Sequence, residues 1–256
     1  MKLAIRQQIS IGIGEGVPRA VQHLLLTPRN HQGQTVREWA VTGPGVDNAA
    51  SFTDAFGNRA MVVNQTKPEA EIVIAAAGVV ETIDKSGVVG RVPGEPAPLL
   101  FTRATALTKP DEALIEGLNR MARDRIALFH TLMERVGSDG QSQSQDGQKQ
   151  SQTASSTPGE LAHRLIGALR ALAIPARYVT GYLAAGDDVP ATFHAWAEAY
   201  DDGLGWIGFD CAQQVCPTER HVRLAVGLDA GSTAPVRSVP GTGSPTPLVV
   251  EIEAGQ

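Results

Sequence analysis

The stretch that decides the fold runs from Phe193 to Asp210 and reads FHAWAEAYDDGLGWIGFD. Two runs with strand-type alternation flank a turn at Asp202-Gly203, and this pattern predicts a β-hairpin. If the chain reverses at Asp202, His194 lies opposite Asp210 on one face of the hairpin, with Cβ atoms about 5 Å apart. The register decides this contact, because a shift of one residue would put the two side chains on opposite faces.

His194 and Asp210 are residue types suited to proton transfer. An aspartate that accepts a hydrogen bond from an imidazole fixes its tautomer and raises its basicity, which is the base-and-orienter half of a nucleophilic triad. A structural histidine–aspartate pair explains the same spacing equally well. Trp196 and Trp206 fall on the same face, where they either line a substrate channel or, as we expect, fill the core.

Two helices are predicted upstream of this hairpin. Apolar residues at three- and four-residue spacing predict one helix from Pro158 to Ala173 and an earlier one from Pro110 to Val136, which Gly137 ends. Between them, residues 138–156 are polar and of low complexity, which predicts a disordered surface loop. Strands are expected around these helices and the hairpin, at 176–183, 192–200, 205–210, 221–227 and 247–253.

The first 95 residues favour strands. Period-two alternation predicts strands at 3–13 and 37–42, and a turn at Asp54–Asn58 leads to two more, at 60–66 and 71–83, which we expect to pair with each other. The fold class is therefore α+β. An antiparallel β domain covers residues 1–95, and a second domain covers 96–256, with helices first and an antiparallel sheet after them.

Composition excludes several classes of protein. The chain has 256 residues, 42% hydrophobic and 19% charged, which is the balance of a globular protein. A net charge of −5 gives no electrostatic footprint for nucleic acid, and no apolar run approaches the roughly 20 residues that span a bilayer. No membrane or nucleic-acid partner is therefore expected. Two cysteines and no secretory signal predict a cytoplasmic protein. The six histidines are scattered, so no metal or other cofactor is expected.

Several motifs resemble those of one family. HAWAE, GWIGFD, the continuation CPTERHVRLAVGLDAGSTAPVRS and the helix GELAHRLIGALRALAIPARYVTGYL resemble bacterial transglutaminase-like proteins, the predicted cysteine proteases of papain-like fold. HLLLTPRNHQGQTVREW and DAFGNR are similar to the N-terminal β domain of that family. The resemblance implies a papain-like transglutaminase domain over residues 96–256, in which a central helix packs on an antiparallel sheet.

The resemblance also implies a catalytic cysteine at the start of the central helix, with a histidine and an aspartate on the sheet. His194 and Asp210 match the last two, but the cysteine's position holds Pro158. Thr157 and Glu160 flank this proline as a capping box, with Pro158 at the first helical position. The chain therefore supplies no thiol there, and proline also lacks the backbone N–H that papain-like enzymes use as an oxyanion donor.

These residues predict a catalytically inactive protein that binds a peptide or protein, or regulates an active paralogue. The candidates for lining its cleft are Thr157, Trp196 and Trp206. The alternative is an active amidase or protease in which His194 and Asp210 serve a displaced nucleophile. The candidates for that role are Cys211, Cys216, Ser155, Ser156 and Thr157, although Cys211 is expected on the strand face opposite to Asp210.

Overall fold

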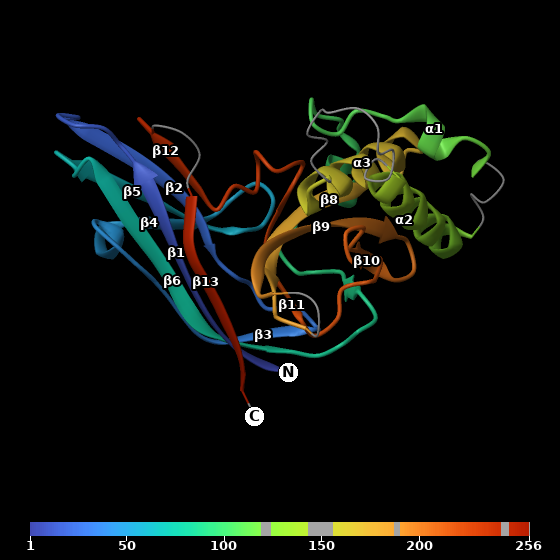
Figure 1. Cartoon of the computed structure of the whole chain (residues 1–256), viewed down its shortest axis with the longest axis horizontal. Helices are drawn as coiled ribbons and strands as arrows, with labels where there is room; N and C mark the ends of the chain where they lie inside the picture. Colours follow the sequence, from blue (N-terminus) through green and yellow to red (C-terminus); the bar gives the residue numbers. More distant parts are fainter. Residues whose placement is uncertain (119–123, 143–155, 187–189, 242–245, 256) are drawn as a thin grey trace.

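A computed structural model of the chain describes residues 1–118, 124–142, 156–186, 190–241 and 246–255. Its strands form three antiparallel sheets (Figure 1). Two four-stranded sheets make the β half of the molecule. The first has the strand order β13 (Thr246–Gly255), β1 (Lys2–Gly12), β6 (Glu71–Thr82), β3 (Gln34–Thr42). The second has the strand order β12 (Val236–Val239), β2 (Arg19–Thr27), β5 (Arg59–Thr66), β4 (Ala50–Thr53).

The third sheet, in the other half, carries the helices. Its strand order is β11 (His221–Gly227), β8 (Ala176–Leu183), β9 (Thr192–Asp201), β10 (Gly205–Phe209), β7 (Val88–Gly90). The α-helices are α1 (Glu112–Ile115), α2 (Arg125–Ser142) and α3 (Pro158–Ala171), and two 3₁₀ turns are η1 (Val46–Asn48) and η2 (Pro98–Thr102). No helix in the described ranges is both long and apolar enough to cross a membrane.

The β half is a sandwich that follows from side-chain alternation. Along β1 buried and exposed residues alternate, so one face of the strand packs against the opposite sheet. The core between the two sheets contains aliphatic side chains from β1, β2, β5, β6 and β12, among them Ile9, Leu24, Val63 and Ile74.

Strand pairing in this half differs from the sequence-based expectation. The stretches 60–66 and 71–83 were expected to pair, but β5 pairs with β2 and β4, whereas β6 pairs with β1 and β3. The strand β2 was not predicted. Local alternation marks a strand but does not select its partner, because pairing depends on contacts between residues far apart in sequence.

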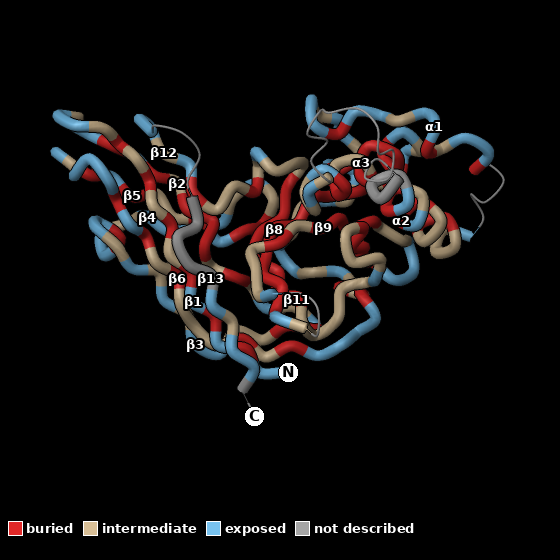
Figure 2. Tube along the Cα trace, viewed as in Figure 1, coloured by how far each residue is buried: buried red, intermediate tan, exposed pale blue. Residues whose placement is uncertain are grey.

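α3 packs on the third sheet and forms the second large core. All eight residues of β8 are buried, and α3 buries Leu165, Ile166 and Leu169 in a cluster with β9 and β10. Figure 2 shows buried residues concentrated in α3 and the strands beneath it. A buried Leu or Ile contributes about 1.5–3 kcal/mol, so this wide apolar surface fixes the position of α3 on the sheet.

The predicted helix from Pro110 to Val136 is interrupted. α1 ends just before Gly117, which has a left-handed φ of 75°, and α2 starts again at Arg125, where the Asp124 carboxylate accepts a hydrogen bond from Ala127 N–H. α2 then continues through Ser142, so residues 138–142 are helical and not part of the predicted loop. The rest of that loop, 143–155, lies outside the described residues.

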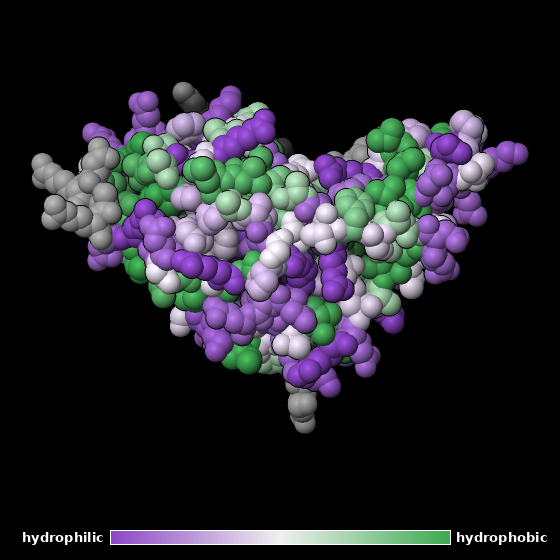
Figure 3. Space-filling view, turned by 180° about the vertical axis from the view of Figure 1, so that it is seen from behind, coloured by the Kyte–Doolittle hydropathy of each residue, from purple (hydrophilic) through white to green (hydrophobic). Residues whose placement is uncertain are grey.

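The two halves exchange strands across residue 95. β7 joins the helix-bearing sheet, and β12 and β13 return to the sheets of the β half. Paired hydrogen bonds also join the two halves. The Asn58 side-chain amide donates to the backbone oxygen of Val226 and accepts from its N–H, and the Gln34 side-chain amide makes the same two bonds with the backbone of Arg223. The halves therefore form one body, with a notch between two lobes in the space-filling view (Figure 3).

A buried ion cluster lies beneath the helix-bearing sheet. Arg177 donates to Glu95 and Glu198, both at 2.6 Å, and Arg223 donates to the same two carboxylates at 2.8 and 3.0 Å. The Arg177 guanidinium also lies 3.8 Å from the centroid of the Trp206 ring. Glu95 comes from the connection between the halves, so these charges tie that connection to β8, β9 and β11.

Candidate functional site

The hairpin of β9 and β10 positions the candidate site, in a register two residues away from the expected one. Phe209 pairs with Ala197, so His194 and Asp210 are not directly opposite. The Asp201 carboxylate accepts from the N–H groups of residues 203 and 204, which makes a three-residue turn. A shift of two keeps every side chain on its face, and Asp210 still reaches His194.

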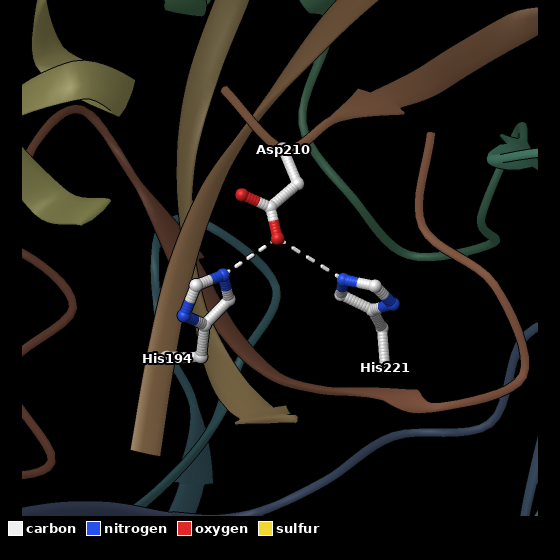
Figure 4. A group of neighbouring side chains, drawn as sticks. All are labelled: His194, Asp210 and His221. Carbon is white, nitrogen blue, oxygen red and sulfur yellow. Dashed lines mark hydrogen bonds and ion pairs between the residues drawn. The ribbon is translucent and has the colours of Figure 1, made fainter. Parts of the chain in front are cut away.

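His194 and Asp210 form a short, buried hydrogen bond. His194 Nε2 lies 2.6 Å from Asp210 Oδ2, and both side chains are almost completely buried (Figure 4). Asp210 ends its strand in a tight turn, where its Oδ1 accepts from the N–H groups of Ala212 and Gln213. The carboxylate is thereby fixed in place, with Oδ2 directed at the imidazole.

A second histidine, His221, completes the site from the other side. Its Nε2 lies 3.2 Å from the same Asp210 Oδ2, while its Nδ1 accepts from Thr218 N–H at 3.1 Å (Figure 4). The Thr218 contact fixes the tautomer, so His221 donates to Asp210 through Nε2–H. Sequence reasoning missed His221, because β11 pairs with β8 and not with the hairpin, and no local pattern encodes that order.

The two imidazoles set the charge of Asp210. Burial alone would raise the pKa of this carboxyl, but the hydrogen bonds from His194 and His221 outweigh burial and hold its pKa well below the usual range. Asp210 is therefore a carboxylate that accepts from both rings. With Nε2–H of His194 donated to Asp210, Nδ1 is the ring nitrogen left to meet a ligand.

The same three residues have the residue types of a metal site, but their hydrogen bonds do not suit one. Ligand atoms of His194, Asp210 and His221 lie within 4.8 Å of one another. A histidine that binds metal through one nitrogen normally donates from the other, whereas His221 Nδ1 accepts from Thr218. The geometry therefore assigns the trio to hydrogen bonding.

A cleft of about 350 Å³ brings His194 and Pro158 together. Pro158 and Gly159 contribute the start of α3, and most of the other walls are apolar. The full lining is Pro158, Gly159, Tyr178, Thr180, Phe193, His194, Ala195, Ala230, Ala234, Pro235 and Val236. Burial raises the pKa of Tyr178 to about 12, so its hydroxyl stays protonated. The cleft thus offers an apolar surface with a few polar groups, which is typical of a binding site.

The three candidates for the cleft lining lie outside it. Trp196 is buried beside His194, with ring centroids 6.3 Å apart, and Trp206 packs in the core against Phe101 and Tyr200. Thr157 precedes the helix but is absent from the lining. The tryptophans therefore support the sheet beneath the site, as the core alternative stated.

Thr157 is fully engaged as a helix cap. Its hydroxyl accepts from Glu160 N–H at 3.3 Å, and the Glu160 carboxylate accepts from Thr157 N–H at 2.7 Å and from its hydroxyl at 3.0 Å. This is a complete capping box with Pro158 at the first helical position. The hydroxyl that was a candidate nucleophile is bound to Glu160 rather than to His194.

Replacing Thr157 with alanine is expected to lower the free energy of unfolding by about 1 kcal/mol, because Glu160 N–H then has no cap. Thr157→Ser, which keeps the hydroxyl, is the matched control and should stay close to the wild type. Chemical denaturation of the three proteins measures the difference. An alanine variant as stable as the serine variant would show that the cap does not stabilise α3.

Neither cysteine borders the cleft. Cys211 is buried in the core under the helices, and burial, with the nearby Asp210 charge, raises the pKa of its thiol. Cys216 is partly buried, and burial raises its pKa as well. Because the thiolate is the reactive form, both positions are chemically unfavourable for a nucleophile.

Comparisons with known proteins agree with this architecture. Residues 112–211 match the family model of the transglutaminase-like superfamily, and residues 3–81 match that of the bacterial transglutaminase-like N-terminal region. An uncharacterised protein of Mycobacterium leprae is 25% identical over an alignment of 261 residues, which covers 89% of each chain. The crystal structure of a proposed cysteine protease from Cytophaga hutchinsonii has a TM-score of 0.69 at 21% identity, over 99% of this chain and 89% of that one. The expected α+β fold, with an N-terminal β region and a papain-like core, is confirmed.

Proposed function

We propose that this chain, which carries a transglutaminase-like core region at residues 112–211 and the N-terminal region of bacterial transglutaminase-like proteins at residues 3–81, has lost amide chemistry and binds a peptide or protein. The observation that carries the proposal is Pro158, which occupies the first turn of α3 and borders the same cleft as His194. A base and its orienting carboxylate are retained, but the neighbouring position has neither a thiol nor a backbone N–H.

The cleft supports binding rather than reaction. Its walls are mainly apolar, and burial of apolar surface contributes roughly 25 cal/mol per Å² to association before its entropic costs. His194 Nδ1 and the Tyr178 hydroxyl supply an acceptor and a donor for a peptide group. In this role the protein acts as a binding or regulatory subunit, with an active paralogue as one class of partner.

The rival function, an active amidase or protease, is favoured by the intact bond between His194 and Asp210. Turnover of a mixed pool of glutamine peptides and amines, followed by mass spectrometry, separates the two. We expect no product from either the wild type or His194→Ala. Product from the wild type that vanishes in His194→Ala would contradict the proposal, and the trapped acyl adduct would identify the nucleophile.

Binding is tested with a peptide library and a variant that fills the cleft. Ala234→Trp places a large ring in the cleft, whereas Ala55→Trp makes the same change in an exposed turn of the β half. Peptides retained by the wild type should be lost by Ala234→Trp and kept by Ala55→Trp. Equal retention by both variants would place binding outside the cleft and contradict the proposal.

Pro158→Cys tests whether position 158 is where a nucleophile would act. The new thiol is expected to alkylate at least ten-fold faster at pH 7 than either native cysteine, because a helix N-terminus and His194 both lower a thiol pKa. Iodoacetamide labelling with peptide mapping measures the rate at each position. Pro158→Cys combined with His194→Ala should react more slowly. A thiol at 158 no faster than Cys216 would contradict this assignment.

A further inference from the structure

Two sequence motifs of the β half surround a hollow that is separate from the cleft. HLLLTPRNHQGQTVREW covers residues 23–39 and DAFGNR covers 54–59. They contribute every residue that lines a hollow of about 400 Å³: Thr27, Pro28, Arg29, Asn30, Val36, Arg37, Trp39 and Arg59. We call this the arginine hollow. It shares no lining residue with the cleft that contains Pro158 and His194.

Three arginines, Arg29, Arg37 and Arg59, line this hollow. Arg29 is held by backbone carbonyls, donating to the oxygens of Gly57 and Pro93. Arg37 is the extra residue of a β-bulge, since Val36 and Glu38 pair with consecutive residues of β6, and a bulge redirects the side chain it carries. Arg59, the first residue of β5, is exposed, and its side chain has no hydrogen-bond partner among the described residues.

Within the part of the chain that the structure describes, the charges of the arginine hollow are balanced only in part. Its lining contains no Asp or Glu. Arg37 has one counter-charge, Glu81, at 2.7 Å, whereas the carbonyls that hold Arg29 are neutral. Two positive charges, at Arg29 and Arg59, therefore remain in a concave surface of a chain with a net charge of −5. Concave surfaces lined by one sign of charge concentrate ions of the opposite sign.

One wall of the arginine hollow is apolar. Pro28, Val36 and Trp39 are its apolar lining residues, and the Nε1–H of Trp39 already donates to Leu26 O at 2.8 Å. Guanidinium groups bind phosphate oxygens in bidentate pairs. We propose that the arginine hollow binds a small organic phosphate monoester, with its dianionic head on Arg29 and Arg59 and its apolar part against Trp39.

Titration of the full-length protein with phenyl phosphate, followed by tryptophan fluorescence or calorimetry, tests this site. We expect saturable binding of one molecule per chain, weakened at least five-fold in Arg59→Gln. Arg19→Gln is the matched control, because Arg19 is an exposed arginine at the start of β2 that lines no part of the hollow. It should change the affinity less than two-fold. Both arginines are exposed, so unchanged melting temperatures verify folding.

The other probes distinguish the parts of the ligand. Inorganic phosphate should bind several-fold more weakly than phenyl phosphate because it lacks the apolar part, and benzoate should bind more weakly because it carries a single charge. Equal affinity for phenyl phosphate and either probe would overturn the phosphate monoester. No saturation, or equal weakening in Arg59→Gln and Arg19→Gln, would overturn the site itself.

Discussion

Replacing Glu198 with alanine is expected to lower the free energy of unfolding by about 3–5 kcal/mol, because it breaks a buried ion cluster from one side. Glu198 is completely buried, and each of its carboxylate oxygens accepts from a different arginine, Arg177 or Arg223. Burial alone would raise the pKa of Glu198, but the two arginines hold it below the usual range. Without this carboxylate, two buried guanidinium groups share Glu95 alone.

Guanidinium denaturation followed by tryptophan fluorescence measures this loss, since Trp206 lies directly against Arg177. Glu198→Gln keeps the shape and removes the charge, so it should be intermediate in stability and provides a folded variant if the alanine variant fails to fold. Glu81→Ala is the control, because it breaks the exposed pair with Arg37 and exposed pairs contribute little. A Glu198→Ala variant as stable as Glu81→Ala would contradict the structural role of the cluster.

Replacing Asp210 with asparagine is expected to cost about 2–4 kcal/mol at neutral pH. Oδ1 and its turn contacts are retained by the amide, but an NH₂ group replaces Oδ2 and faces two N–H donors. His221 cannot relieve this by changing its tautomer, because its Nδ1 already accepts from Thr218 N–H. If the amide turns over instead, the N–H groups of Ala212 and Gln213 lose their acceptor. Either way, buried donors are left unpaired.

The cost of Asp210→Asn should depend on pH with a definite sign. The folded pKa of Asp210 is lowered, so its carboxylate contributes stability that is complete above the unfolded pKa of about 3.9 and is lost as the pH falls towards the folded pKa. The difference between wild type and variant should therefore be constant from about pH 7 to 5 and shrink below about pH 4.

Chemical denaturation at neutral and acidic pH measures this dependence. Asp202→Asn makes the same change at an exposed position of the same hairpin and should match the wild type throughout. A difference between wild type and Asp210→Asn that grows on acidification would contradict the lowered pKa.

The hairpin shows how far local sequence determines this site. Alternation along β9 and β10 and the turn between them were enough to predict that His194 and Asp210 meet. Side chains alternate between the two faces of a strand, so a register shift of two residues leaves both side chains on the same face. The register itself depends on the turn, in which the Asp201 carboxylate accepts hydrogen bonds from two backbone N–H groups. The sequence fits turns of different length equally well, so it does not reveal this register.

Other parts of the site depend on contacts between distant residues. His221 reaches Asp210 only because β11 lies beside β8, and Glu95 reaches Arg177 only because the connection between the halves passes under the sheet. Neither residue carries a periodic or motif signal. The helix α3, by contrast, was predicted well, because its apolar stripe, its capping box and the residues that end it are all local features of the sequence.

The pairing of β1 with β13 has a consequence for biosynthesis. Lys2 pairs with Gly255 and Ser10 with Thr246, so β1 leaves the ribosome long before the strand that pairs with it. Until then, β1 exposes an unpaired edge, as does β2 until β12 arrives. Open edges recruit other strands, and pairings of large sequence separation form slowly. The sandwich is therefore completed only after β12 and β13 have been synthesised, and until then the open edges of β1 and β2 favour aggregation of the nascent chain.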